Sequence, residues 1–356
     1  METAKHGGDV YRNRITCDFS VSLNPLGMPE AVREALKSSV DSWERYPDPE
    51  CDELVRAIAG YHRVDPSFVL CGNGAADLIY QVTMAVRPKK ALVTAPAFSE
   101  YEQALLAVGS QVVRFPLRED EGFAPDMDRF SDAVTEDTDL VFFCNPNNPT
   151  GRAARRSEVE RLAGVCEEKN AVLVLDECFC DLMEKPERFS MAPLAGAYPG
   201  MFLIRAFTKT YAMAGLRLGY AICGNSTLTE KLRRIRQPWS VSIPAQTAGA
   251  AALKESGYLD EARALIRAER NYLKAGLSRL GFKVFESQAN FLLFSDERER
   301  ENKAGGCLWE QLKERGILIR DCGNFPGLER GYYRVAVRRR EENAALLSAL
   351  AQIKEK

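Results

Sequence analysis

The chain has 356 residues, a formal net charge of −2, 46% hydrophobic residues and 28% charged residues. Such a composition is typical of a globular protein with a large core, and the length favours two domains over one. The near-neutral charge argues against nucleic acid or an anionic membrane as the main partner.

The cysteines and histidines argue against a metal site. None of the ten cysteines belongs to a Cys-x-x-Cys pair, Cys178 and Cys180 are poorly spaced for metal binding, and the chain has only two histidines. Many unpaired thiols in a chain of this size indicate a reducing compartment. The chain starts without an apolar signal region, and no later apolar run is long enough for a bilayer, so we expect a cytoplasmic protein without membrane contacts.

Short apolar runs alternate with helix-period segments through the first two thirds of the chain. This rhythm predicts an α/β domain with a mostly parallel sheet flanked by helices. The expected strands are 69–71, 91–94, 140–143, 172–175, 202–204 and 220–222, and the expected helices include 75–86, 98–108 and 157–169.

The pattern changes from about residue 250 and predicts a smaller α+β domain. A long amphipathic helix is expected at 257–280, followed by strands at 283–285, 291–294, 317–319 and 333–336 and a last helix at 340–354. The predicted division is therefore an irregular N-terminal segment (1–40), a large domain (41–250) and a C-terminal small domain (251–356).

The first polar motif, Gly72-Asn73-Gly74-Ala75-Ala76-Asp77, follows a strand and opens a helix. Small residues at this position let a phosphate approach the free amides of the helix N-terminus. As a dinucleotide fingerprint the motif fails, because Asp77 takes the place of the third glycine. A plain strand-to-helix turn is the alternative interpretation.

Other strands also run into polar or aromatic motifs, and ligands of a doubly wound sheet bind beyond these carboxyl ends. Asp176 ends a fully apolar strand, which is costly for a carboxylate without a partner. Lys209 follows another strand, as expected of a lysine that forms a Schiff base against a dry wall. The remaining motifs are Phe98 with Tyr101, the turn Asn145-Pro146-Asn147-Asn148-Pro149-Thr150-Gly151, and Thr208 with Arg217 beside Lys209.

In this order and at these spacings, the motifs resemble those of pyridoxal-phosphate (PLP) enzymes of fold type I, the class I/II aminotransferase superfamily. The resemblance implies PLP as cofactor and Lys209 as its Schiff-base residue. It also implies that Phe98, or as a second candidate Tyr101, contacts the face of the cofactor ring. Asn148 is expected to contact O3′, and Asp176 the ring nitrogen. The residues expected at the phosphate are Gly74, Ala75, Ala76, Thr208 and Arg217.

This chain departs from the pattern of the family at two positions. Phe179 takes the place of a tyrosine that often binds O3′, and Ala206 takes the place of a hydroxyl residue. Tyr46, in Arg45-Tyr46-Pro47-Asp48-Pro49, resembles the tyrosine that reaches the cofactor phosphate of the neighbouring subunit. The resemblance therefore implies a homodimer with shared active sites, and an N-terminal segment that packs on the small domain at the mouth of the site.

Two subfamilies are similar to this chain: histidinol-phosphate aminotransferase and the L-threonine-O-3-phosphate decarboxylase of cobalamin biosynthesis. Phe179 and Arg152, the latter directly after Pro-Thr-Gly, resemble the decarboxylase more. The segments 6–11, 18–27 and 289–294 and Arg338 with the residues after it do so too. The best prediction is thus a decarboxylase-like enzyme acting on a phosphorylated amino acid, with the aminotransferase as the alternative.

Such a substrate needs two anion sites besides that of the cofactor phosphate. The backbone amides of Gly7 and Gly8, with His6 and Arg152, form one candidate. Arg334 matches the arginine that binds the substrate carboxylate in the family, and Arg338 is expected beside it. Asn24, within 18–27, is a further candidate substrate contact.

Two remote alternatives come from other classes of protein. A non-catalytic PLP-binding sensor of a transcription regulator would need a DNA-binding domain, and the chain has no room for one ahead of Tyr46. An NAD-binding enzyme is disfavoured by the incomplete glycine fingerprint. Which bond of the substrate breaks depends on how its carboxylate is held, and the sequence leaves decarboxylation and transamination both open.

Overall fold

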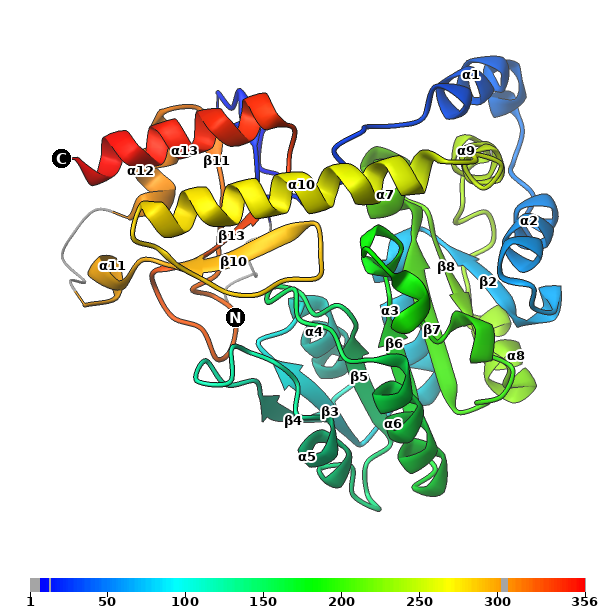
Figure 1. Ribbon diagram of the computed structural model, residues 1–356. Helices are drawn as coiled ribbons and strands as arrows, with labels where there is room; N and C mark the ends of the chain where they lie inside the picture. The colour runs from blue at the N-terminus through cyan, green and yellow to red at the C-terminus, as the bar shows by residue number, and fades with distance from the viewer. Residues whose placement is uncertain (1–6, 13, 302–306, 356) are drawn as a thin grey trace.

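The structure, a computed structural model, describes residues 7–12, 14–301 and 307–355. A seven-stranded sheet with the strand order β2-β8-β7-β6-β5-β3-β4 forms the centre of the larger part (Figure 1). Its strands are β2 (Val69–Gly72), β3 (Lys90–Ala95), β4 (Gln111–Pro116), β5 (Leu140–Cys144), β6 (Val172–Asp176), β7 (Met201–Ala206) and β8 (Gly219–Ile222).

The central sheet is mostly parallel, as predicted. Five neighbouring strands, β7, β6, β5, β3 and β4, pair in parallel. Only β8 runs antiparallel to its neighbours, β7 and β2. Every residue of β5 is buried, because helices cover both faces of the sheet, and this explains the continuous apolar runs. The sequence did not predict β4, whose exposed Gln111 and Arg114 are typical of an edge strand.

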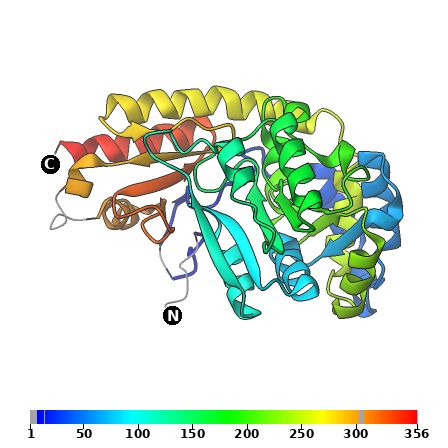
Figure 2. The ribbon, with the colours of Figure 1, turned by 90° about the horizontal axis from the view of Figure 1, so that it is seen from below.

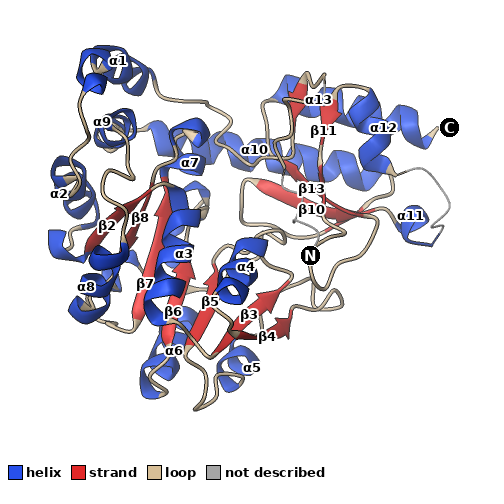
Figure 3. Cartoon of the chain, turned by 180° about the vertical axis from the view of Figure 1, so that it is seen from behind, coloured by secondary structure: helices blue, strands red, loops and turns tan. Residues whose placement is uncertain are grey.

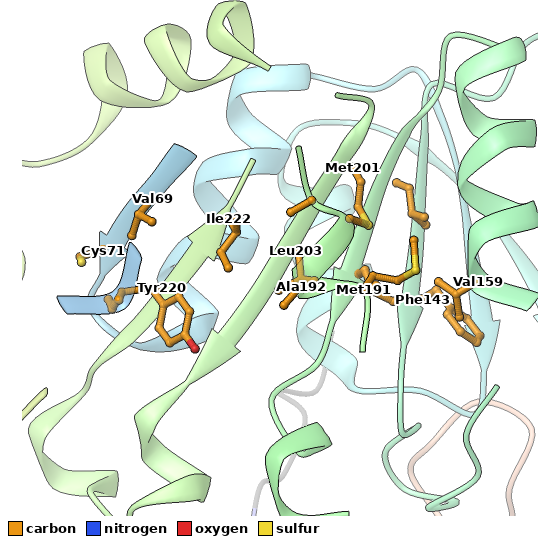
Figure 4. Close-up of a cluster of buried hydrophobic side chains, with 14 of the residues drawn as sticks. Val69, Cys71, Phe143, Val159, Met191, Ala192, Met201, Leu203, Tyr220 and Ile222 are labelled. Atoms are coloured by element: carbon orange, nitrogen blue, oxygen red, sulfur yellow. The ribbon is translucent and has the colours of Figure 1, made fainter. Parts of the chain in front are cut away.

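Helices cover both faces of the central sheet (Figure 3). One buried cluster joins one face of the sheet to several helices, and Figure 4 shows part of it. These helices include α1 (Glu30–Ser38), α2 (Asp52–His62), α5 (Met127–Asp132), α6 (Arg156–Glu168) and α9 (Ile243–Ala252). A second cluster joins the other face to α3 (Gly74–Val86), α4 (Ser99–Ala107) and α8 (Ser226–Ile235).

A smaller antiparallel sheet, in the order β12-β13-β10-β9, lies beside the central one (Figure 2). Helix α10 (Tyr258–Arg279) packs against α13 (Arg340–Lys354), and both bury apolar residues against this sheet. This arrangement confirms the smaller α+β part. The other elements here are β9 (Lys283–Val284), β10 (Phe291–Ser295), α11 (Glu297–Glu301), α12 (Leu308–Glu314), β11 (Ile317–Leu318), β12 (Arg320–Asp321) and β13 (Tyr332–Ala336).

The N-terminal segment contacts both parts of the molecule. Strand β1 (Cys17–Asp18) pairs in parallel with β11, whereas helix α1 (Glu30–Ser38) packs against α9. The sequence predicted no helix in this segment, although Val32 of α1 is fully buried. The predicted strand 317–319 is also divided: β11 pairs with β1, and β12 pairs with β13. The domain boundaries at 40 and 250 stay a prediction.

Within the described ranges, no helix has the length and apolar character that crossing a membrane requires. The same ranges contain no group of three or more His, Cys, Asp or Glu side chains placed to hold a metal ion.

Candidate active site

A cavity of about 250 Å³ lies beyond the carboxyl ends of β5, β6 and β7, between the central sheet and the small sheet. It brings together most of the candidate residues. The predicted residues that line it are Gly7, Ala75, Ala76, Phe98, Tyr101, Asn148, Asp176, Thr208, Lys209, Arg217 and Arg334; Ser20, Val21, Ser99, Cys144, Cys178, Phe179, Ala206, Arg320 and Phe325 also line it.

Lys209 lies on the short helix α7 (Phe207–Thr210), directly after β7. The Asn24 amide N–H donates to the Lys209 carbonyl (3.0 Å), and Asn24 Nδ2 donates to the carbonyl of Thr210 (2.9 Å). Burial lowers the pKa of Lys209 to about 8, and the positive charges of Arg334 and Arg217 contribute. Much of this amine is therefore neutral, and so nucleophilic, at mildly alkaline pH.

Asp176 ends β6 and is 5% exposed. Its Oδ2 accepts a hydrogen bond from Tyr101 Oη (2.6 Å), and its Oδ1 accepts one from the backbone N–H of Cys178 (2.9 Å). No arginine, lysine or histidine of the described chain forms an ion pair with it. The carboxylate thus borders the cavity with two neutral donors and no salt-bridge partner among the described residues.

The N-terminus of α3 meets Arg217. Gly74 has a φ of +81°, and a Cβ added there would lie 2.5 Å from Nη2 of Arg217. Ala75 and Ala76 follow in the first turn, where helix N–H groups lack partners within the helix, and Thr208 and Arg217 line the same cavity. These amides, the hydroxyl and the guanidinium form an anion cradle.

Arg334, on β13, is 7% exposed and pairs with no carboxylate of the described chain. Its Nη1 donates to Asn148 Oδ1, its Nη2 donates to the carbonyl of Ser20 (2.9 Å), and its buried Nε has no partner among the described residues. Burial lowers the pKa of Arg334 to about 10, and the neighbouring Arg320 contributes to this shift. Such a cation is stabilised when an anion enters the cavity.

Arg320 is a second buried cation, which the sequence did not point out. It lies on β12 directly opposite Arg334 in the strand register and is 8% exposed. It donates to the carbonyl of Asp321 (2.6 Å) and to Asn324 Oδ1 (2.9 Å), both neutral acceptors. Burial lowers the pKa of Arg320. No sequence motif surrounds Arg320, so only its position opposite Arg334 in the folded sheet identifies it as a candidate site residue.

Of the two predicted N-terminal glycines, only Gly7 lines the cavity. The Gly8 amide donates to Ser20 Oγ (2.7 Å). An added Cβ on Gly7 would lie 2.5 Å from the Ser20 carbonyl oxygen, the atom that also accepts from Arg334. His6 lies outside the described residues, so its predicted role stays a prediction.

Six of the described predicted residues do not line the cavity: Gly8, Gly74, Asn24, Tyr46, Arg152 and Arg338. The amide of Asn24 binds the backbone around Lys209, and the carbonyl of Arg152 accepts from the backbone N–H of Asn147. Arg338 pairs with Glu342 (2.7 Å), so its placement does not support the expected pairing of Arg338 with Arg334. Tyr46 is 76% exposed and stacks on the ring of Trp239 at 4.6 Å.

Comparisons with known proteins identify the family of this chain. Residues 14–350 match the family "Aminotransferase class I and II". The threonine-phosphate decarboxylase of Salmonella typhimurium is 38% identical over 94% of this chain and 90% of its own. Histidinol-phosphate aminotransferase 1 of Cupriavidus pinatubonensis is 34% identical over 92% and 85%. The crystal structure of the histidinol-phosphate aminotransferase from Clostridium acetobutylicum superposes with a TM-score of 0.86, at 29% identity, over 95% of this chain and 99% of that one.

The chain belongs to the class I and II aminotransferase family. Its relatives are PLP-dependent decarboxylases and aminotransferases of fold type I, so the predicted class of enzyme, the fold and the cofactor are confirmed. The described residues fit PLP: the anion cradle suits its phosphate, Asp176 without a salt-bridge partner suits a protonated ring nitrogen, and the pKa of Lys209 near 8 suits Schiff-base formation.

Proposed function

We propose that this enzyme is a decarboxylase of L-threonine O-3-phosphate in the synthesis of the cobalamin side chain. The observation that carries the proposal is the pair Arg320 and Arg334. Both guanidinium groups are buried at one cavity, and neither pairs with a carboxylate of the described chain. Burying two unpaired cations is costly, and a substrate with two anionic groups offsets that cost.

Threonine phosphate carries a carboxylate and a phosphate in one molecule, so it can engage both arginines at once. Histidinol phosphate carries a phosphate but no carboxylate, so one of the two arginines would lack an anionic partner. We assign the carboxylate to Arg334, because Asn148 Oδ1 and the Ser20 carbonyl hold two of its nitrogens and leave Nε without a partner. Arg320 and the amide of Gly7 are then placed to bind the phosphate.

In this proposal the cavity residues hold PLP as the family pattern implies. The anion cradle of Gly74, Ala75, Ala76, Thr208 and Arg217 binds its phosphate, Asp176 binds the ring nitrogen, Phe98 covers a ring face and Asn148 contacts O3′. When bound, the cofactor supplies a conjugated ring that accepts the electron pair of the bond broken at the substrate Cα.

The residues of the chain select and complete the reaction. Arg334 fixes the carboxylate, and the position in which it holds this group would decide which bond at the substrate Cα breaks. In decarboxylation the Cα–carboxylate bond breaks, carbon dioxide leaves, and Cα takes up a proton. Lys209 Nζ, with a pKa near 8, can hold this proton and deliver it at neutral to mildly alkaline pH.

A histidinol-phosphate type of aminotransferase is the second candidate. Its support is the 34% identity to such an enzyme and the position of Lys209, which could equally remove a proton from Cα. In that reaction Lys209 acts as a base, and an amino group passes to a keto acid.

The two candidates are separated by incubating the PLP-loaded protein with L-threonine O-3-phosphate, with and without 2-oxoglutarate. We expect carbon dioxide in both samples and no glutamate. A parallel incubation with L-histidinol phosphate and 2-oxoglutarate should form little glutamate. Glutamate formation without carbon dioxide would overturn the decarboxylase and favour the aminotransferase.

We further propose that the enzyme works as a homodimer with shared active sites in the cytoplasm. Tyr46, Trp43, Val40 and Trp239 are 48–76% exposed, which is unusual for large apolar side chains and suits burial against a second copy. Tyr46 lies outside the cavity of its own chain, consistent with a role in that of a partner. The ten free cysteines support a reducing compartment.

A further inference from the structure

A loop of the larger part packs into the smaller α+β part beside the cavity. Residues 117–123 follow β4 and form a tight turn, in which the N–H of Phe123 donates to the carbonyl of Arg118 (2.8 Å). Phe123 has a φ of +55° and is 1% exposed. A bulky residue adopts this backbone conformation only at a cost in free energy, which the packing of its ring must offset.

The ring of Phe123 packs among side chains of the smaller part. It meets Phe285 edge-on at 4.9 Å and 67°, and Tyr332 of β13 at 6.2 Å and 79°. The other buried members of the same cluster are Leu117, Leu293, Cys322 and Phe325. Since Phe123 and Leu117 come from the loop and the rest from the smaller part, this cluster joins the two parts by apolar packing.

Glu119, in the same loop, adds ion pairs to this contact. Its carboxylate pairs with Lys283 of β9 (2.6 Å) and with Arg300 of α11 (3.1 Å), both in the smaller part. Glu121, two residues further on, pairs instead with Arg129 of α5 in the larger part (2.6 Å). The loop therefore contains one glutamate that joins the two parts and one that does not.

The cluster is connected to Arg320 through Phe325. The guanidinium of Arg320 lies over the ring of Phe325, 5.0 Å from its centroid, and both residues line the cavity. The N–H of Phe325 donates to the carbonyl of Cys322 (3.0 Å), and the N–H of Cys322 donates to the carbonyl of Tyr332 (2.8 Å). Tyr332, whose ring contacts Phe123, thus anchors the turn to which Phe325 belongs.

We propose that the loop 117–123 positions the residue that binds the substrate phosphate: through Glu119 and Phe123 it holds the smaller part so that Arg320 stays directed at the cavity. The ring of Phe325 covers one face of the guanidinium, so a shift of this ring also shifts the cation. The inference rests on the proposed function, because it takes Arg320 as the phosphate ligand.

The test compares two matched pairs of variants. Glu119→Gln is compared with Glu121→Gln, since both glutamates lie in one loop and only Glu119 pairs with the smaller part. Phe123→Leu is compared with Phe282→Leu. Phe282 is also buried and meets Phe294 edge-on at 5.1 Å and 72°, but no member of its cluster lines the cavity.

Steady-state decarboxylation of L-threonine O-3-phosphate by the PLP-loaded proteins gives KM and kcat. Titration of the apo proteins with PLP gives the Kd of the cofactor, and thermal unfolding checks that each variant folds. Glu119→Gln and Phe123→Leu are then repeated in an Arg320→Met background. If Phe123→Leu does not fold, the pair of glutamate variants decides alone.

We expect Glu119→Gln to raise KM about threefold to fivefold and Phe123→Leu about tenfold, with kcat changed less than about twofold. Glu121→Gln and Phe282→Leu should leave KM unchanged. The Kd of PLP should stay the same in all four variants, because these side chains lie outside the cavity. In the Arg320→Met background the two loop variants should add almost nothing to KM, since their effect passes through Arg320.

If the KM of each loop variant equals that of its control, the inference is wrong, and release of carbon dioxide by the wild type leaves the proposed function intact. A rise in KM that persists in full in the Arg320→Met background would also overturn the inference, because the loop would then act without Arg320. So would a lower kcat at unchanged KM, which indicates a general loss of packing. If the wild type released no carbon dioxide from L-threonine O-3-phosphate, the proposed function itself would fail, and the inference with it.

Discussion

At the residue scale, the lowered pKa of Lys209 has a consequence for the stability of the apo protein. Burial moves this pKa from 10.5 to about 8, so the native state releases the proton before the unfolded state does. Below pH 8 both states are protonated and the native state carries the full cost of a buried charge. As the pH rises above 8 that cost disappears, so this group adds stability with increasing pH.

We therefore expect the free energy of unfolding of the apo wild type, relative to that of Lys209→Met, to rise by about 2 kcal/mol between about pH 7 and about pH 9.5. Urea unfolding of both apo proteins at several pH values measures this difference. Subtracting the free energy of unfolding of the variant from that of the wild type removes the contributions of the other titrating groups. A constant difference across this range would show that Lys209 has an ordinary pKa.

Arg320 and Arg338 offer a second comparison of single residues. Arg320 faces the cavity beside Arg334, whereas Arg338 pairs with Glu342. Arg320→Met should raise the KM for L-threonine O-3-phosphate about 100-fold, since a buried charged contact of about 3 kcal/mol is lost. Arg338→Met should change it less than about threefold. Steady-state kinetics measure both, and the reverse order would restore the sequence-based expectation for Arg338.

At the element scale, the N-terminus of α3 depends on a glycine. Gly74→Ala would bring a Cβ within 2.5 Å of Arg217 Nη2, at a φ of +81°. The matched control is Gly109→Ala, because Gly109 has a φ of +79° but open space around it. Both variants should lose about 1 kcal/mol of stability from backbone strain.

Only Gly74→Ala should weaken PLP binding, and by at least about tenfold, because Arg217 must leave the cradle. Equilibrium titration of the two apo variants with PLP gives this comparison. Equal losses of PLP affinity in both variants would mean that backbone strain, and not the position of Arg217, determines how well the anion cradle binds the cofactor.

The sequence predicted whole elements well where the apolar runs are continuous. Strands β5, β6 and β7 are buried on both faces, so their composition alone marks them. The edge strand β4 mixes exposed and partly buried residues without a continuous apolar run, and the sequence did not predict it. The run 317–319 was predicted as one strand, but its first two residues form β11, which pairs with β1, and the next strand, β12, pairs with β13. Such a change of sheet leaves no local signal.

At the scale of the whole molecule, shared active sites can be tested by mixing chains. Tyr46→Ala and Lys209→Ala are each expected to be inactive as homodimers. In a mixed dimer, one site takes Lys209 from the first variant and Tyr46 from the second, so it is complete. Random mixing should restore about one quarter of wild-type activity, given that half of the dimers are mixed and one of their two sites is complete.

Subunits are exchanged by co-refolding, and size-exclusion chromatography confirms the dimers. No recovery of activity in verified mixed dimers would show that Tyr46 acts within its own chain or not at all. The exposed Trp239, which stacks on Tyr46, serves as an internal probe, because its fluorescence should change on dimer formation.

The sequence by itself determined the class of fold and predicted most of the residues that line the candidate site. Most of these residues lie at or shortly after the end of a strand, as Asp176 and Lys209 do. Parallel strands bring their carboxyl ends to one edge of the sheet, so order and spacing along the chain predict that these residues meet. Only the tertiary structure decided which arginine joins Arg334 and which carboxylate Tyr101 contacts. These partners lie across strand pairs or between a helix and a strand, and their side chains meet because of register and packing, which no contiguous segment encodes.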